Sequence, residues 1–404
     1  MKNRAALIFI FVTLTIDAMA IGLIIPVMPD LLRDIQGGDM GNAAIWGGIL
    51  ATVFAAMQFV FGPTIGSLSD QFGRRPVLLI SMFIMAVDYV VMGLAHSIWA
   101  LIVLRVIGGI AASTQSTAAA FISDLSPADK KSTNFGIIGA AFGIGFVLGP
   151  LLGGVLGEYG VRVPFFVAAG IAMANLGLGL FVLPETVTDT IRRPFDAKRA
   201  NPLGALLQIR QMPGLAWLLV VFFLYEVAFY VYPAIWPYFT QIQFGWGPGM
   251  VGLSLTIFGV AIAVVEGVLI RYLIPGLGER RVMLYGFLFN IGIFTVLGLI
   301  TSGFWALALA PISALGAVVV PTMRGLISKQ AGDDAQGEIQ GIIASTQSLA
   351  IIIAPLVLTN VFFASTRAQT WYYLPGAAFL LAAVITVLAL VIFLLQPARV
   401  VSGK

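Results

Sequence analysis

The chain contains no cysteine and only one histidine among its 404 residues. Without cysteine it can form neither disulfide bonds nor thiolate metal sites. The single His96 falls in a short predicted loop, so the sequence indicates neither an imidazole cluster for a metal nor a histidine-based triad. It also lacks the Gly-x-x-x-x-Gly-Lys-Ser/Thr loop that binds nucleotide phosphates. We therefore expect no metal, no cofactor and no enzymatic reaction.

Charged residues are scarce as well. They make up 10% of the chain and hydrophobic residues 59%, whereas an ordinary soluble domain has about 25% and about 45–50%. A soluble fold could not bury that much apolar surface. Because a helix needs about 20 apolar residues to cross the bilayer, the chain has room for about a dozen spans. The sequence thus predicts an all-α integral membrane protein with twelve transmembrane helices.

Apolar runs broken by glycine, proline and charge locate the predicted spans. The first run looks like a cleavable signal peptide, but it continues past the possible cleavage site, and we expect it to be retained as a span. The twelve spans are predicted at residues 5–28, 43–64, 77–95, 98–122, 134–157, 163–183, 214–239, 249–272, 282–301, 304–327, 338–361 and 371–395.

The lysines and arginines are distributed unevenly over the predicted loops. Eighteen are assigned to the side that holds both termini, Arg105 lies within a span, and the opposite side has only Arg33, Arg162 and Arg367. Because cytoplasmic loops carry an excess of Lys and Arg, both termini are predicted to be cytoplasmic. The same distribution explains the net charge of +4 without a nucleic-acid partner.

The two halves of the chain share a pattern. The longest polar interval, residues 184–213, predicts a cytoplasmic linker between an N-terminal six-helix bundle at 1–183 and a C-terminal one at 214–404. Short motifs recur at a constant offset of 205 residues: Ile122-Ser123, Gly136-Ile137-Ile138 and Pro150 recur as Ile327-Ser328, Gly341-Ile342-Ile343 and Pro355. This indicates duplication, and duplicated halves place a binding site between them that alternating access exposes to either side.

Two glycine-containing motifs follow in the first half. Between spans two and three the chain reads Gly66-Ser67-Leu68-Ser69-Asp70-Gln71-Phe72-Gly73-Arg74-Arg75-Pro76, in which glycines permit a tight turn and an acid with two arginines can hold helix ends together. We predict a conformational latch between the halves from Gly66, Asp70, Gly73, Arg74 and Arg75. The alternative is a turn that only sets topology. Span five carries closely spaced small residues that allow helices to touch backbone to backbone, namely Gly139, Gly143, Gly149, Pro150, Gly153 and Gly154.

The loop resembles the signature loop of the major facilitator superfamily, with Gln71 where a basic residue is usual. The span-five glycines are similar to a motif of the superfamily's antiporter branch, and the chain most resembles the tetracycline-type drug/proton antiporters. The resemblance implies two pseudo-symmetric six-helix bundles in a bacterial inner membrane and export of a drug-like molecule against protons. Helix packing alone is the alternative explanation of the glycines.

Five ionisable residues lie well inside predicted spans: Asp17, Asp88, Arg105, Glu226 and Glu266. Each costs at least about 2.5–3.5 kcal/mol at the bilayer centre, so we expect them to be functional or paired. Asp88 and Arg105 flank His96 almost symmetrically and are predicted to pair at one depth. Asp17, Asp88, Arg105 and Glu226 are the predicted proton-coupling residues. Glu266 could instead pair with Arg271 or with a neighbouring span.

Predicted substrate contacts are Asp17, Gln115, Glu226, Tyr230, Trp236 and Asn290. An acid among aromatic rings suits a cationic or amphipathic ligand. The resemblance implies an acid in span nine, where this chain has Asn290, which cannot exchange a proton. Glu226 or Glu266 would have to replace that acid, so a substrate other than tetracycline is equally compatible.

The expected partners are a small-molecule substrate, protons and the lipid bilayer, with no obligate protein partner. Two other functions share many of these features. An importer or facilitator of a small nutrient would have the same fold, and a membrane receptor would bind a ligand without moving it.

Overall fold

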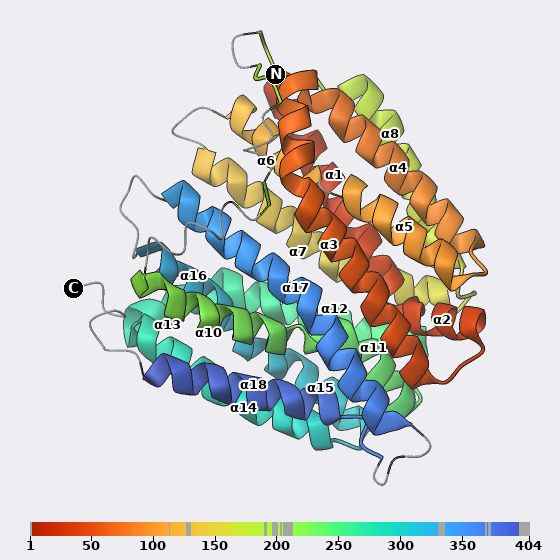
Figure 1. Cartoon of the computed structure of the whole chain (residues 1–404), viewed down its shortest axis with the longest axis vertical. Helices are drawn as coiled ribbons and strands as arrows, with labels where there is room; N and C mark the ends of the chain where they lie inside the picture. Colours follow the sequence, from red (N-terminus) through yellow and green to blue (C-terminus); the bar gives the residue numbers. More distant parts are fainter. Residues whose placement is uncertain are drawn as a thin grey trace. The chain divides into compact units, whose positions relative to one another are not determined.

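The computed structural model describes residues 2–112, 114–126, 131–189, 192–195, 201–202, 204, 213–329, 336–367, 370 and 373–395. These residues are almost entirely helical and contain no strand (Figure 1). Twelve helical segments among them are long and apolar enough to cross a membrane. The predicted all-α membrane fold with twelve transmembrane helices is therefore confirmed.

Helices of the first half overlap all six predicted spans. Their bounds are α1 Lys2–Ile24, the 3₁₀ segment η1 Ile25–Val27, α2 Met28–Gln36, α3 Met40–Phe72, α4 Arg74–Leu94, α5 Ile98–Ala111, α6 Thr114–Leu125, α7 Lys131–Gly157 and α8 Val163–Val182. The first span is α1, η1 and α2 together, and the fourth is α5 and α6.

Helices of the second half overlap the other six spans. Their bounds are α10 Pro213–Phe229, α11 Val231–Phe244, α12 Pro248–Val264, the π-helical segment η4 Val265–Leu269, α13 Ile270–Leu277, α14 Glu279–Leu299, α15 Gly303–Ser313, the 3₁₀ segment η5 Ala314–Val318, α16 Val319–Lys329, α17 Gln336–Thr366 and α18 Ala377–Leu394. Spans seven, eight and ten are each built from more than one of these segments.

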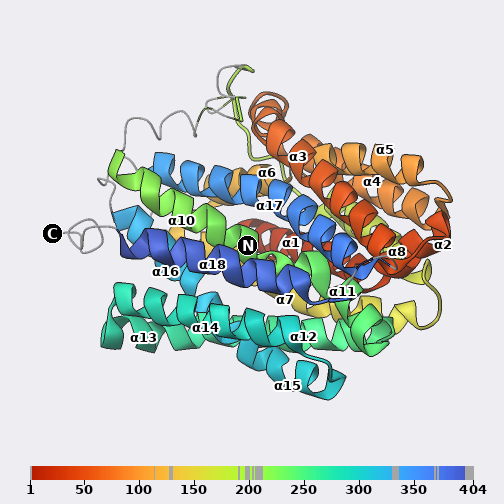
Figure 2. The same ribbon diagram turned by 60° about the horizontal axis from the view of Figure 1, so that its bottom comes forward.

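The contacts within the chain define two compact units. Unit 1 contains Met1–Gly37, Val53–Pro202 and Gly247–Thr256, and unit 2 contains Gly38–Thr52, Leu203–Trp246 and Ile257–Lys404. In unit 1, α4 packs against α5 and α8, and in unit 2, α10 lies beside α17 and α18 (Figures 1 and 2). The division into bundles at residues 183 and 214 stays a prediction.

Local geometry repeats between the halves at the offset seen in the sequence. α4 and α14 are each 21 residues long. Each begins after a glycine in the positive-φ region, Gly73 at φ 109° and Gly278 at φ 79°, with ψ at 152° in both. Each is followed by an extended residue, Ala95 at ψ 135° and Ile300 at ψ 134°. The offset of 205 residues therefore joins positions with the same backbone conformation.

Glycines on α7 let it approach α1 backbone to backbone in unit 1. A Cβ added to Gly149 would lie 2.5 Å from the Met19 carbonyl oxygen. One added to Gly153 would meet the Leu23 carbonyl even more closely. In lipid, where helices gain little from the hydrophobic effect, such close packing is a main source of association.

The other glycines of the predicted motif differ in their surroundings. Gly154 faces the first turn of α12, where an added Cβ would lie 3.0 Å from the Gly252 Cα. Pro150 packs on Gly22. Gly139 and Gly143, in contrast, have open space where a Cβ would be. Close backbone packing is therefore found for Gly149, Gly153 and Gly154, whereas the described residues show none at Gly139 and Gly143.

Substitution of Gly149 by alanine should destabilise the protein, whereas Gly143→Ala should not. The new methyl group at position 149 overlaps the α1 backbone, and overpacking of this kind costs about 1–3 kcal/mol. At position 143 the methyl group has room, and alanine is the better helix former. Thermal melting in detergent, followed by size-exclusion chromatography, compares the two variants. Equal melting temperatures would contradict the assigned α1–α7 contact.

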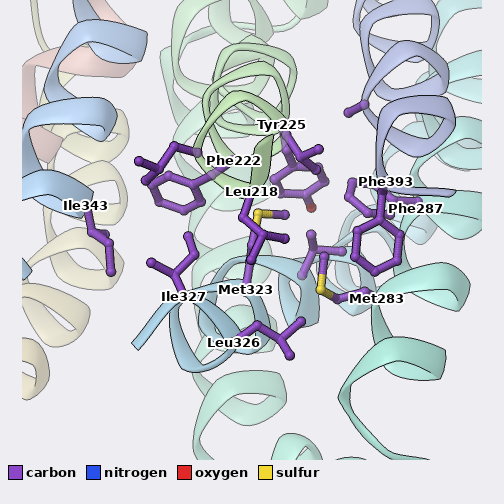
Figure 3. Packing of buried hydrophobic residues seen from close by; sticks show 14 of the residues in the cluster. Leu218, Phe222, Tyr225, Met283, Phe287, Met323, Leu326, Ile327, Ile343 and Phe393 are labelled. Atoms are coloured by element: carbon purple, nitrogen blue, oxygen red, sulfur yellow. The ribbon is translucent and has the colours of Figure 1, made fainter. Parts of the chain in front are cut away.

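The interior of unit 2 is a cluster of large apolar side chains from several spans (Figure 3). α10, α14, α16, α17 and α18 contribute to it Leu218, Phe222, Tyr225, Met283, Phe287, Met323, Leu326, Ile327, Ile343 and Phe393. The ring of Tyr225 packs edge to face on Phe287, with centroids 5.6 Å apart. This packing fixes α10 and thereby positions the polar residue that follows Tyr225.

Candidate functional site

The polar centre of unit 1 is an ion pair between adjacent spans. Arg105 Nη2 on α5 donates to Asp88 Oδ2 on α4 at 2.8 Å, and the two residues are 7% and 1% exposed. The guanidinium also contacts Met92 Sδ and lies 5.0 Å from the centroid of the Phe54 ring. The pair predicted from the spacing about His96 is present, and Phe54 adds a cation–π contact that the sequence did not reveal.

This pair is not fully satisfied. Asp88 Oδ1 and Arg105 Nε are buried and have no hydrogen-bond partner in the part of the chain that the structure describes. Asp88 lies over Gly108, where an added Cβ would be 3.2 Å from both carboxylate oxygens. A buried polar atom without a hydrogen-bond partner is energetically costly. Because one hydrogen bond joins the two side chains, the remaining atoms are available to bind a proton or a polar solute.

Asp17 on α1 is the third predicted charge of unit 1, and it has no counter-ion among the described residues. Its side chain is half-buried, and no hydrogen bond or ion pair to it occurs among the described residues. The buried Tyr89 packs with Ala20 and Leu23 of α1 and lies within electrostatic range of Asp17, Asp88 and Arg105. The structure therefore brings the three predicted charges of unit 1 around Tyr89, a residue that sequence reasoning missed.

The predicted latch region is mostly helix rather than loop. α3 extends through Phe72, so Gly66 and Asp70 lie on its last turns, and Gly73 alone makes the turn to α4. The prediction that Gly66 to Arg75 form a loop was therefore wrong, because helix covers all of these residues except Gly73. Glycine at position 66 does not mark a turn, because a helix continues through it without strain.

Arg74 is held between acids at this junction. Its Nη1 pairs with Asp70 Oδ1 at 2.5 Å and donates to Ser69 Oγ at 2.6 Å, while Nε pairs with Asp124 Oδ2 on α6 at 3.3 Å. The partners join α3, α4 and α6 within unit 1. Asp124 was missed by sequence reasoning, and the role of Asp70 in holding the two halves together stays a prediction.

Glu185, three residues after the end of α8, caps α4. The Glu185 carboxylate accepts the backbone N–H of Arg74 at 2.9 Å and of Arg75 at 3.2 Å. Such a carboxylate at a helix N-terminus satisfies free donors and the helix dipole. Gly73 leaves it room, because an added Cβ would overlap the carboxylate. Arg75 Nη2 meanwhile donates to the Leu180 carbonyl at 2.7 Å.

The second half has an ion pair at the corresponding junction with the charges reversed. Glu279 and Lys329 stand 205 residues after Arg74 and Asp124, and Lys329 Nζ lies 2.7 Å from Glu279 Oε1. The junction that looks degenerate in sequence therefore keeps the contact between the same two helices of its half. A solvent-accessible ion pair of this kind contributes little to stability, so its main effect is to fix the positions of α14 and α16 relative to each other.

The polar centre of unit 2 joins spans seven, ten and eleven. Glu226 on α10 is 8% exposed. Gln347 Nε2 on α17 lies 3.4 Å from both of its carboxylate oxygens, and Arg324 Nη2 on α16 donates to Gln347 Oε1 at 2.6 Å. Arg324 is one of the eighteen basic residues that the sequence assigns to the cytoplasmic side, whereas its half-buried side chain lies in this interior network.

Glu266 lies on η4, a π-helical segment in the middle of span eight, and π-bulges frequently occur at functional sites. η4 contacts the 3₁₀ segment η5 of span ten. The basic residue within electrostatic range of Glu266 is Arg324. No ion pair joins Glu266 to Arg271 in the described chain, so of the two expectations the neighbouring span is favoured.

Asn290 on α14 is fully buried. Its Nδ2 donates to Gly286 O at 2.9 Å and Gly316 O at 3.1 Å and approaches Tyr225 Oη at 2.9 Å. Tyr225 in turn donates to Gly316 O at 2.9 Å, a carbonyl of η5 that also accepts the backbone N–H of Val319. The geometry favours a role in fixing span ten, and direct contact of Asn290 with substrate stays a prediction.

The aromatic candidates occupy different surroundings. Trp236 is 4% exposed and packs among Phe239, Trp246 and Phe379. Tyr230 is half-buried at the break between α10 and α11. Trp236 is thus placed as a packing residue and Tyr230 as the more accessible one. The side chain of Gln115 lies outside the described residues.

The sequence matches the family model "Major Facilitator Superfamily" over residues 10–355, and the chain belongs to that family. Relatives include the class C tetracycline resistance protein of Escherichia coli, 36% identical over 371 residues that cover 92% of each chain. The class E protein of Escherichia coli is 35% identical over 403 residues, 98% of this chain and 95% of that one. Among solved structures, the human organic anion transporter MFSD10 (TETRAN) is 25% identical, with a TM-score of 0.70 over 97% of this chain and 99% of that one.

Proposed function

We propose that this protein is a proton-coupled antiporter that exports a drug-like small molecule across the inner membrane of a bacterium by alternating access. The observation that carries the proposal is the presence in each unit of an interior acid without a direct counter-ion among the described residues, Asp17 in unit 1 and Glu226 in unit 2. Such an acid can exchange a proton. Because an ionisable residue inside a membrane is energetically costly, its presence there indicates a function. The chain's similarity over nearly its full length to tetracycline resistance proteins supports export and gives the direction.

The substrate we propose is cationic or amphipathic and includes tetracycline-like molecules. Glu226 directly follows Tyr225 and precedes a segment rich in aromatic rings, which suits a ligand that is both charged and apolar. Because Asn290 is buried and cannot exchange a proton, Glu226 takes the place of the span-nine acid in this proposal.

We place both termini in the cytoplasm, with protons and the lipid bilayer as the remaining partners. The distribution of Lys and Arg supports this orientation even without Arg324, since seventeen residues on one side still face three on the other. No enzymatic reaction is proposed.

Accumulation of tetracycline in cells tests the proposal. Cells that make the protein should hold less tetracycline than cells that make Asp17→Asn at the same level in the membrane. A protonophore should abolish the difference, because export then loses its driving force. Greater accumulation in cells with the unaltered protein would instead indicate uptake, and equal accumulation for tetracycline and a panel of cationic drugs would contradict export.

A further inference from the structure

One amide separates the acid and the base of the unit 2 centre. Gln347 donates through Nε2 toward both oxygens of Glu226 at 3.4 Å and accepts through Oε1 from Arg324 at 2.6 Å. The amide thus faces the carboxylate with its donor and the guanidinium with its acceptor. No Glu226–Arg324 ion pair within 4.0 Å occurs, although the two attract each other electrostatically.

Arg324 has an incomplete set of partners. Its Nε is buried and has no acceptor in the described part of the chain, and no described carboxylate pairs with it. A guanidinium stays charged under all physiological conditions. Because an uncompensated charge inside a membrane protein is costly, Arg324 would gain by closing directly onto a carboxylate.

Few other groups can influence Glu226. The elements packed on α10 include α16, which contributes Arg324, and α17, which contributes the neutral Gln347. α18 also packs on α10 but contains no titratable residue. Glu266 lies within electrostatic range, and Tyr225 is the adjacent residue on α10. Arg324 is therefore the one described cation that competes for this carboxylate.

We propose that Gln347 is a positioning residue that acts as a spacer, holding Arg324 away from Glu226 so that the carboxylate stays available to a proton or to a cationic group of the substrate. The inference deepens the proposed antiport and rests on it for its meaning in transport. A direct bidentate pair with arginine would keep the carboxylate ionised and occupied. With the amide between them, the acid can change partners without first breaking an ion pair.

The reactivity of Glu226 toward an apolar carbodiimide tests the spacer without any substrate. The reagent adds to a protonated carboxyl group, so an acid paired with arginine reacts slowly. We expect labelling of Glu226, followed by mass spectrometry on the full-length protein in lipid nanodiscs, to be slower by about tenfold or more in Gln347→Ala, because Arg324 closes onto Glu226. Adding Arg324→Gln to Gln347→Ala should restore the rate.

Matched variants control for nonspecific effects. Gln243→Ala removes an amide from the same unit, where it donates to the Ile300 carbonyl, and should label like the unaltered protein. Glu226→Gln should lose the mark and so identifies the labelled site. Gln347→Ser opens the same space and replaces the alanine variant if that variant does not fold. An unchanged or faster rate in the Gln347 variants, or a slow rate that persists without Arg324, would overturn the spacer.

A transport measurement on the same preparations separates the spacer from the proposed function. If the spacer is correct and the protein is an antiporter, Gln347→Ala loses both labelling and tetracycline exchange, and the double variant regains labelling alone. If the unaltered protein exchanges no tetracycline or cationic drug, the proposed function fails while the labelling result still decides the geometry.

Discussion

Asp17→Asn is expected to abolish proton-driven export while leaving the protein folded and inserted. Asparagine keeps the size and hydrogen-bonding capacity of the side chain but cannot release a proton. Asp17 has no described ion-pair partner whose loss would disturb the structure. Drug uptake by everted vesicles with an imposed pH gradient measures the effect, and the residual rate should be indistinguishable from empty vesicles.

Asp34→Asn is the control for this prediction. Asp34 is an exposed residue of the same unit that pairs with Arg162 at 2.9 Å. Surface pairs contribute about 0–1 kcal/mol, so this variant should transport normally. Full transport by Asp17→Asn would remove Asp17 from the coupling mechanism, and loss of transport in both variants would show that the assay reports general damage.

The second large effect is expected for Arg105→Ala, which leaves Asp88 buried without its partner. Removing one member of a buried ion pair costs about 3–5 kcal/mol when the other stays charged. We therefore expect both a lower melting temperature in detergent and a loss of transport. The cation–π contact with Phe54 is lost in the same substitution and adds to the effect.

The double variant Arg105→Ala with Asp88→Asn separates stability from transport. Without the uncompensated carboxylate it should recover most of the melting temperature, yet remain inactive because the acid is gone. A single variant that melts like the unaltered protein would show that the pair contributes no stability. Recovery of transport in the double variant would show that neither charge takes part in coupling.

Hydropathy and duplication made the architecture predictable. Each span needs about 20 predominantly apolar residues, so a span can be recognised from the local composition of the sequence. All twelve predicted spans were found. The recurrence at 205 residues also anticipated backbone geometry, as Gly73 and Gly278 show. The segments η4 and η5 were not anticipated, because a local change in helical pitch has no signature in residue type.

The interior charges were only partly predictable. Acids in the middle of a span are conspicuous, and the depth of Asp88 and Arg105 followed from one short turn. Arg324 was misassigned because a long side chain near a helix end can turn inward or snorkel outward, and the sequence does not distinguish these. Gln347 gave no signal because a neutral amide is unremarkable until its neighbours are known.

The glycine pattern shows a different limit. Several glycines of α7 recur at a spacing of four residues, but only those facing α1 or α12 make close contacts, while Gly139 and Gly143 have open space. Spacing identifies a helix face, whereas the partner of that face is set by tertiary packing. Glu185 was missed for a similar reason, since a cap supplied from a distant segment is invisible in the capped helix itself.

The movement of protons during drug transport tests the central claim of antiport most directly. Purified protein is reconstituted into liposomes that contain a trapped pH-sensitive dye and no initial pH gradient, and a drug gradient is imposed from outside. We predict that drug entering the liposomes drives protons out, so that the lumen becomes alkaline, and that Asp17→Asn abolishes this change. Acidification of the lumen would demonstrate symport, and drug entry without any pH change would demonstrate uncoupled transport; either result would contradict the account.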